Sequence, residues 1–273
     1  MNHSLKLGGA VFVLAGAALS AVSAQAAAVA TPAIGDLFLG VRASGGQGAA
    51  VSYVANIGSD LTYRNAPAGT STDIASLGGI GADLAATYGT NWASRNDLHW
   101  SIFGARQSVN STLYASREQN PAGSLTLAWP ELTQTARNAT ATSVIDVISG
   151  IGGYTGSEST SNSTVAIWQT NSGSASSYNN QVAALGTTDF GSLSQWTSVE
   201  GDFGDGASGT ALDLYRIASS GVTLVGTFSL SGSGVLHFTT PVPEPGTLLF
   251  GAAALALGLR RHRAARAVET PSL

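Results

Sequence analysis

The stretch Leu212–Thr239, LDLYRIASSGVTLVGTFSLSGSGVLHFT, carries the clearest strand pattern in this chain of 273 residues. Its first segment, Leu212–Ile217, is typical of a β-strand. Apolar residues then recur on even positions, which predicts a second strand with one apolar face. These residues are Val222, Leu224, Phe228 and Leu230. The Ser-Gly-Ser-Gly run at Ser231–Gly234 indicates a turn into a third strand, Val235–Thr239. The stretch therefore predicts an antiparallel meander.

Similar alternation recurs upstream of this meander. Three segments alternate apolar and polar or small residues, namely Leu37–Val41, Val51–Ile57 and Leu98–Phe103. Further strand candidates are Leu113–Ser116, Leu125–Trp129 and Val165–Trp168. Gly81–Gly89 predicts a short helix that stops at Gly89. Val144–Ile148 fits either a strand or the end of a helix that begins near Glu131.

The loops between these segments support a sheet protein. Thr155–Thr164 and Thr170–Gln181 are rich in Ser, Asn, Gly and Thr, which predicts long polar loops. Many short strands with polar turns, and no sustained alternation with long helices, are typical of an antiparallel sandwich. We therefore expect a mainly β fold, a single antiparallel β-sandwich over residues 27–240 with a small helical insertion. Two small β-domains are the alternative.

Composition restricts the possible partners. The only lysine is Lys6, and between Ala27 and Pro245 seven arginines face fifteen acidic residues, a net charge of −8. Nucleic acids and anionic membranes attract basic surfaces, so the sequence predicts no nucleic-acid partner. The chain has no cysteine. Thiol catalysis, thiolate metal sites and disulfides are therefore excluded.

The N-terminus has the features of an export signal. Lys6 precedes an apolar core, Leu7–Leu19, and a small-x-small site follows at Ala24-Gln25-Ala26. This order is typical of a cleaved signal peptide, here residues 1–26. Cleavage after Ala28 or Ala30 is the alternative. The mature chain is thus expected to begin at Ala27, Val29 or Thr31.

The C-terminus has three parts in order: Val242-Pro243-Glu244-Pro245, the uncharged run Gly246–Leu259, and a cluster of arginines. The cluster consists of Arg260, Arg261, Arg263 and Arg266. As a helix the apolar run would be about 21 Å long, against about 30 Å of bilayer hydrocarbon. Basic flanks stay cytoplasmic, which places the body outside. The two prolines favour an extended peptide just before the membrane.

This ordered triple over residues 241–266 resembles the PEP-CTERM sorting signal, although Ala267–Leu273 extends beyond the arginines. The resemblance implies a protein exported by Gram-negative bacteria. It also implies that a membrane-embedded enzyme, exosortase, processes the tail after transient inner-membrane attachment by the helix 246–259. The expected destination is the cell surface or the extracellular matrix, with exopolysaccharide as a possible partner. An ordinary C-terminal anchor is the alternative.

Acidic residues in the body form one candidate site. Glu200, Asp202 and Asp205 crowd the Gly-rich loop EGDFGDG. Such carboxylates can bind calcium, or they can lie in an exposed turn without a metal. The same acids could also serve glycoside hydrolysis if two of them faced each other across a cleft. We expect no metal and no cofactor.

The remaining motifs favour structural interpretations. His99 and His237 lie on expected strands, as outward-facing side chains. The run 204–209 matches Gly-x-Gly-x-x-Gly but leads into a strand, which excludes a dinucleotide site. Five tryptophans are expected mainly in the core, with a carbohydrate-stacking platform as the alternative. They are Trp92, Trp100, Trp129, Trp168 and Trp196.

These features together favour an exported, non-enzymatic surface or extracellular-matrix protein. The alternative is a secreted module that binds or hydrolyses glycans.

Overall fold

A computed structural model describes residues 32–242, except 75–76, 122, 155–156, 160, 163–165, 185–188, 195–197 and 204–210. The predicted signal peptide, the tail from Pro243 onward, Asp205 and Trp196 lie outside the described residues. Within the described part, no helix is both long enough and apolar enough to cross a bilayer.

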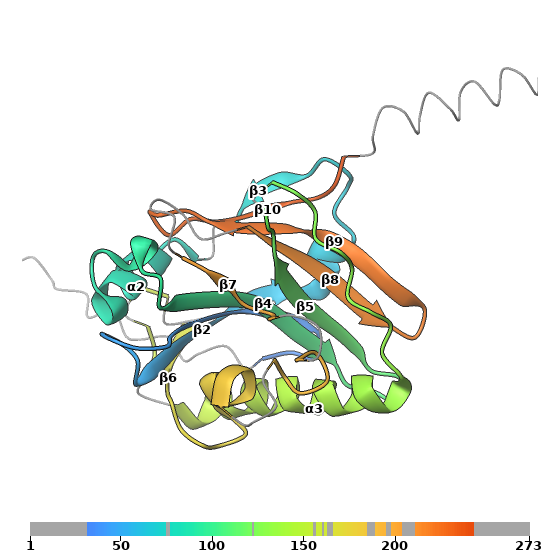
Figure 1. Cartoon of the computed structure of the whole chain (residues 1–273), viewed down its shortest axis with the longest axis horizontal. Coiled ribbons are helices and arrows are strands. Elements are labelled where there is room, and N and C mark those ends of the chain that lie inside the picture. Colours follow the sequence, from blue (N-terminus) through green and yellow to red (C-terminus); the bar gives the residue numbers. More distant parts are fainter. Residues whose placement is uncertain are drawn as a thin grey trace, which may run out of the picture.

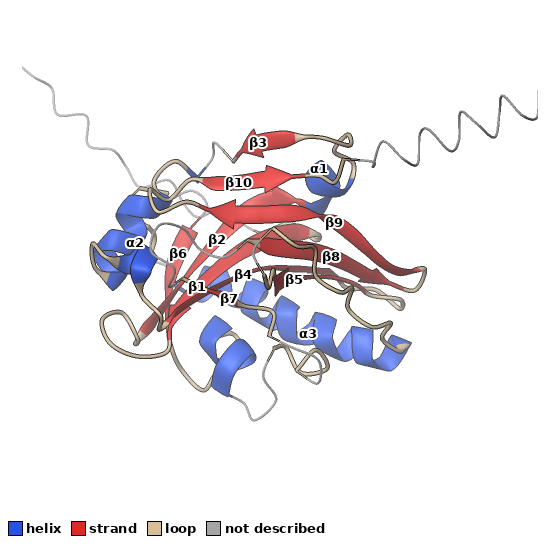
Figure 2. Cartoon of the chain, turned by 45° about the horizontal axis from the view of Figure 1, so that its top comes forward, coloured by secondary structure: helices blue, strands red, loops and turns tan. Residues whose placement is uncertain are grey.

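The described part is mainly β, as expected. The strands are β1 (Asp36–Ala43), β2 (Val51–Ser59), β3 (Ser71–Asp73), β4 (Leu98–Arg106), β5 (Thr112–Glu118), β6 (Ala166–Thr170), β7 (Gly201–Asp202), β8 (Leu212–Ala218), β9 (Gly221–Leu230) and β10 (Leu236–Thr239). They form one sheet in the order β3-β10-β9-β8-β5-β4-β1-β2-β6, with β7 paired to β4. Every pairing is antiparallel. Figures 1 and 2 show that this sheet curls.

The curled sheet replaces the two stacked sheets of the expected sandwich. One of its faces packs residues such as Leu39, Trp100 and Phe228 into a core with the helices α1 (Asp60–Arg64) and α2 (Ile80–Tyr88). The opposite face packs residues such as Phe38 and Phe103 against α3 (Gln134–Gly150), which lies beneath the sheet in Figure 2. A sheet that curls buries its apolar face against itself and its helices, so no second sheet is needed.

Helix positions agree in part with the sequence pattern. The expected helix at Gly81–Gly89 is α2, and Gly89 follows it at a φ of 95°. Val144–Ile148 lies inside α3, which confirms the helical alternative. Short helical turns also occur at Trp92–Ser94, Ile151–Tyr154 and Asn180–Ala184. The strand expected at Leu125–Trp129 is absent, because its Thr126 N–H donates to the Asp213 side chain instead of joining a neighbouring strand.

The meander contains one irregularity that alternation did not predict. Gly226 pairs with Leu214 and Leu224 pairs with Tyr215, so Val225 is an extra residue in β9. Such a bulge reverses which face later side chains occupy. Val222 and Leu224 accordingly pack on the α3 side, whereas Phe228 and Leu230 pack on the other side. The expectation that these four residues share one face is therefore wrong.

Candidate functional site

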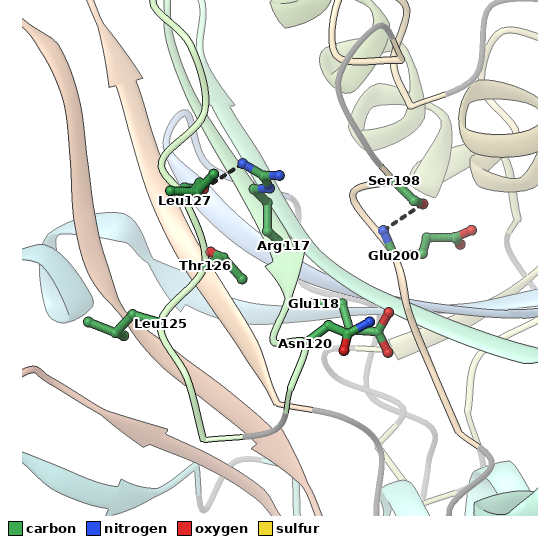
Figure 3. Close-up of a pocket in the computed structure, with 8 residues that line it drawn as sticks. All are labelled: Arg117, Glu118, Asn120, Leu125, Thr126, Leu127, Ser198 and Glu200. Carbon is green, nitrogen blue, oxygen red and sulfur yellow. Dashed lines mark hydrogen bonds between the residues drawn. The ribbon is translucent and has the colours of Figure 1, made fainter.

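A pocket of about 410 Å³ opens where β5 ends (Figure 3). Three segments line it: Arg117, Glu118 and Asn120; Leu125–Leu127; and Ser198 and Glu200. Figure 3 shows the Leu125–Leu127 segment on one side and Ser198 and Glu200 on the other. Six of the eight lining residues are charged or polar and two are leucines, so the pocket offers mainly hydrogen-bonding groups.

Buried side chains of β8 hold the Leu125–Leu127 segment in place. Asp213, which is fully buried, accepts hydrogen bonds from Thr126 N at 2.7 Å, from Gln119 Nε2 at 2.7 Å and from Thr227 Oγ1 at 2.8 Å. Tyr215 Oη donates to the Thr126 carbonyl at 2.6 Å. A buried carboxylate needs such donors to offset the loss of water. The same bonds fix the backbone of this wall of the pocket.

Arg117 joins this wall to the core. Its Nη1 donates to the carbonyl oxygens of Leu127 and, at 3.3 Å, Ala128. Its Cζ lies 4.9 Å from the ring centroid of Trp129, in cation–π range. Burial lowers the pKa of Arg117, although a guanidinium remains charged at neutral pH. Arg117 therefore supplies a fixed positive charge beside Glu118.

Glu200 faces away from the pocket (Figure 3) and belongs to a buried network. Arg42 Nε donates to its two carboxylate oxygens at 2.9 and 3.0 Å, and Tyr178 Oη donates to Oε1 at 2.9 Å. The Glu200 side chain is only 4% exposed. Burial alone would lower the pKa of Arg42, but the charge and hydrogen bonds of Glu200 outweigh it and raise that pKa. Burial, with the Glu200 charge, raises the pKa of Tyr178 well above its usual value.

Tyr178 places this network on the sheet. Its ring stacks on Phe103 with centroids 5.3 Å apart, and its Oη lies 2.7 Å from Ser101 Oγ. A Cβ at Gly40 would lie 2.5 Å from the Tyr178 ring, so only glycine fits in β1 at this point. Glu200 is thus the counter-ion that joins its segment to β1, which disfavours a role as a catalytic acid.

Asp202 makes a separate contact. His99 Nδ1 lies 2.5 Å from Asp202 Oδ1, and His99 Nε2 lies 3.2 Å from Ser44 Oγ. The order matches a Ser-His-Asp relay. However, the Ser44 hydroxyl also donates to the Asp97 carbonyl, and none of the three relay residues lines the pocket.

The same arrangement occurs a second time, where β3 pairs with β10 at one edge of the sheet. His237 Nδ1 lies 2.6 Å from Asp73 Oδ1, and its Nε2 lies 3.0 Å from Ser71 Oγ. In both cases a histidine on a sheet strand pairs with an aspartate directly opposite on a strand of two or three residues, β7 or β3. We interpret both groups as contacts that hold a short strand on the sheet, and we call them the histidine clips. The histidine and the aspartate are 103 residues apart in the first pair and 164 in the second, so sequence patterns could not reveal these pairs.

The proposed calcium ligands have different partners in the structure. Glu200 binds Arg42 and Asp202 binds His99, while Asp205 lies outside the described residues. Among the residues that are described, no three or more His, Asp or Glu side chains form a group that could hold a metal.

Millimolar calcium is therefore expected to leave the melting temperature unchanged. A filled calcium site at about 100 times its dissociation constant would add roughly 2.7 kcal/mol and raise the melting temperature by roughly 5–10 °C. Thermal unfolding with calcium and with a chelator measures this difference. A rise of that size that disappears in Asp202→Ala and Asp205→Ala would show that these acids bind calcium.

The tryptophans mostly serve the core. Trp92, Trp100 and Trp129 are between 0% and 3% exposed, so they offer no stacking platform. Trp168 on β6 is half-buried, and Trp196 lies outside the described residues. The expectation of core packing is confirmed for the three buried rings.

Comparisons of this chain with protein-family models, with curated proteins and with solved structures found no match. The fold and the site define a mainly β protein with a mixed polar and apolar pocket at the end of β5.

Proposed function

We propose that this chain is an exported, non-enzymatic surface or extracellular-matrix protein that a membrane-embedded, exosortase-like enzyme processes at its tail. The signal peptide 1–26 directs export, and the helix 246–259 holds the chain briefly in the inner membrane. The arginines from Arg260 to Arg266 keep the end of the tail cytoplasmic. The body is acidic and has no cysteine, so it carries no thiol that the oxidising environment outside the cell could modify.

The observation that carries this proposal is where the described body ends, just before the sorting motif in the sequence. Thr240 follows β10 and is tied to the segment Pro67–Thr70: its N–H donates to Thr70 O at 3.0 Å, and its Oγ1 donates to Pro67 O at 2.7 Å. Val242 is already 70% exposed. The Pro243-Glu244-Pro245 motif thus begins three residues after an anchored position, where an enzyme at the membrane could grip it.

The glycan-hydrolase alternative has less support. Retaining and inverting glycosidases need two carboxyl groups on either side of the substrate bond. Of the two glutamates at the pocket, Glu200 is bound to Arg42 and Tyr178 and points away. Only Glu118 is left to face a ligand, which fits binding better than hydrolysis.

Replacing Glu244 with alanine is expected to stop processing. Glu244 lies between the two prolines, and a basic or hydrogen-bonding pocket of the enzyme can bind its carboxylate. The variant should stay full-length in the inner-membrane fraction, whereas the wild-type protein should reach the surface in a shortened form. Fractionation and intact mass in a host that has the sorting enzyme measure both.

A matched control changes the apolar run without changing its hydrophobicity. Leu248→Ile with Leu249→Ile should be processed normally, because lipid responds to hydrophobicity more than to side-chain shape. A shortened Glu244→Ala protein at the surface would refute the sorting-signal proposal, and the tail would then be only an anchor.

A further inference from the structure

We propose that the pocket at the end of β5 binds a neutral saccharide. Through this site the exported protein would bind exopolysaccharide. This inference rests on the proposed extracellular location for its biological meaning, but the binding itself does not depend on how the tail is processed.

Three neighbouring side chains offer hydrogen bonds of different kinds to a ligand. Glu118 Oε1 accepts a weak hydrogen bond from Asp202 N at 3.3 Å, and its Oε2 has no partner within the described part of the chain. Asn120 is exposed and carries both a donor and an acceptor. Arg117 uses Nη1 on the wall of the pocket, so its other nitrogens remain as donors among the described residues. Sugar hydroxyls donate and accept at once and can satisfy this mixed set.

The charges around the pocket favour an uncharged ligand. Arg117 and Glu118 bring one positive and one negative charge, and Glu200 is already neutralised by Arg42. The body carries a net charge of −8, which repels anionic polymers. A neutral polysaccharide meets no such repulsion.

The apolar part of the pocket is unusually exposed and yet fixed. Leu125 is 62% and Leu127 is 84% exposed. Between them, Thr126 is bound on both its N–H and its carbonyl oxygen by Asp213 and Tyr215. A wall that is ordered before binding loses little entropy when a ligand arrives. Aliphatic side chains at such a wall can cover the C–H face of a sugar ring while its hydroxyls reach Glu118 and Asn120.

The size of the pocket is compatible with this ligand class. Ligand sites commonly have volumes of about 300–1,000 Å³. The pocket here, at about 410 Å³, falls within this range.

Binding is tested with the exported protein recovered from the cell surface, on an array of neutral and acidic oligosaccharides. The best neutral oligosaccharide is then titrated calorimetrically into wild type and variants. Glu118→Gln keeps an oxygen that can accept from Asp202 N but removes the charge. It is expected to weaken binding about tenfold or more, as loss of a charged hydrogen bond does. Asn120→Ala should also weaken binding, and Glu131→Gln, an exposed acid outside the pocket lining, should bind like wild type.

Three outcomes would overturn the proposal: no neutral oligosaccharide binds, acidic ones bind more tightly, or Glu118→Gln binds like wild type with an unchanged melting temperature. These outcomes differ from failure of the sorting proposal, which is seen as a shortened Glu244→Ala protein at the cell surface and leaves the saccharide affinity unchanged.

Discussion

Replacing Arg42 with methionine is expected to lower the free energy of unfolding by about 3–5 kcal/mol, because it leaves a buried carboxylate without its counter-charge. The pair lies between β1 and the segment before β7, with side-chain exposures of 11% for Arg42 and 4% for Glu200. After the substitution, the Tyr178 hydroxyl would be the only group that the described structure offers to the Glu200 side chain. Urea unfolding at neutral pH measures the change as a lower midpoint.

The matched control removes both charges. Arg42→Met combined with Glu200→Leu leaves no buried ion, so it should recover most of the lost stability. Tyr178 still has Ser101 as a hydrogen-bond partner in that variant. A double variant as unstable as Arg42→Met alone would show that packing, rather than charge burial, dominates at this position.

Replacing Asp60 with asparagine should cost about 3 kcal/mol, at the lower end of the range for broken buried pairs because Arg106 is one third exposed. Asp60 is fully buried at the start of α1. Arg106 Nε donates to its two oxygens at 3.1 and 3.0 Å, and the Tyr114 hydroxyl donates to Oδ2. An amide cannot replace both acceptors. Asp146→Asn serves as the control. Asp146 is half-buried on α3, and its replacement should change stability little.

The dependence of the folding stability on pH gives a second test of the role of Asp60. Burial alone would raise the pKa of Asp60, but hydrogen bonds from Arg106 and Tyr114 outweigh it and lower the pKa below the ordinary 3.8. The ionised group therefore stabilises the fold above about pH 4, and this contribution is lost as the pH falls through the lowered pKa. Asp60→Asn should lose less stability than wild type between about pH 5 and pH 2. Equal losses in both proteins would contradict this role of Asp60.

Local sequence patterns predicted many strands because alternation reports which side chains face an apolar core. The structure contains the two alternating segments Leu37–Val41 and Leu98–Phe103 as parts of β1 and β4. Gly89 ends α2 as expected. Alternation was misleading at Leu125–Trp129, where Thr126 bonds to a side chain from a strand 87 residues away. It also misplaced Phe228 and Leu230, because the bulge at Val225 is defined by pairing with β8.

The candidate pocket could not be predicted in this way. Its lining comes from the end of β5, from an irregular segment and from the residues before β7. The sequence pattern places Glu200 in a Gly-rich loop, yet Arg42, 158 residues away, pairs with it and makes it part of the core. Glu118 and Asn120 carry no motif, so no sequence signal pointed to them.

The order of residues along the chain was enough to predict the mainly β class, to give the acidic and cysteine-free composition, and to propose the sorting signal, because each depends on local periodicity, on counting or on a linear motif. Tertiary contacts were needed to establish one curled sheet in place of two, the two histidine clips and the pocket. Each of these depends on pairings between residues far apart in the chain, and a local pattern carries no information about which distant strand will supply the partner.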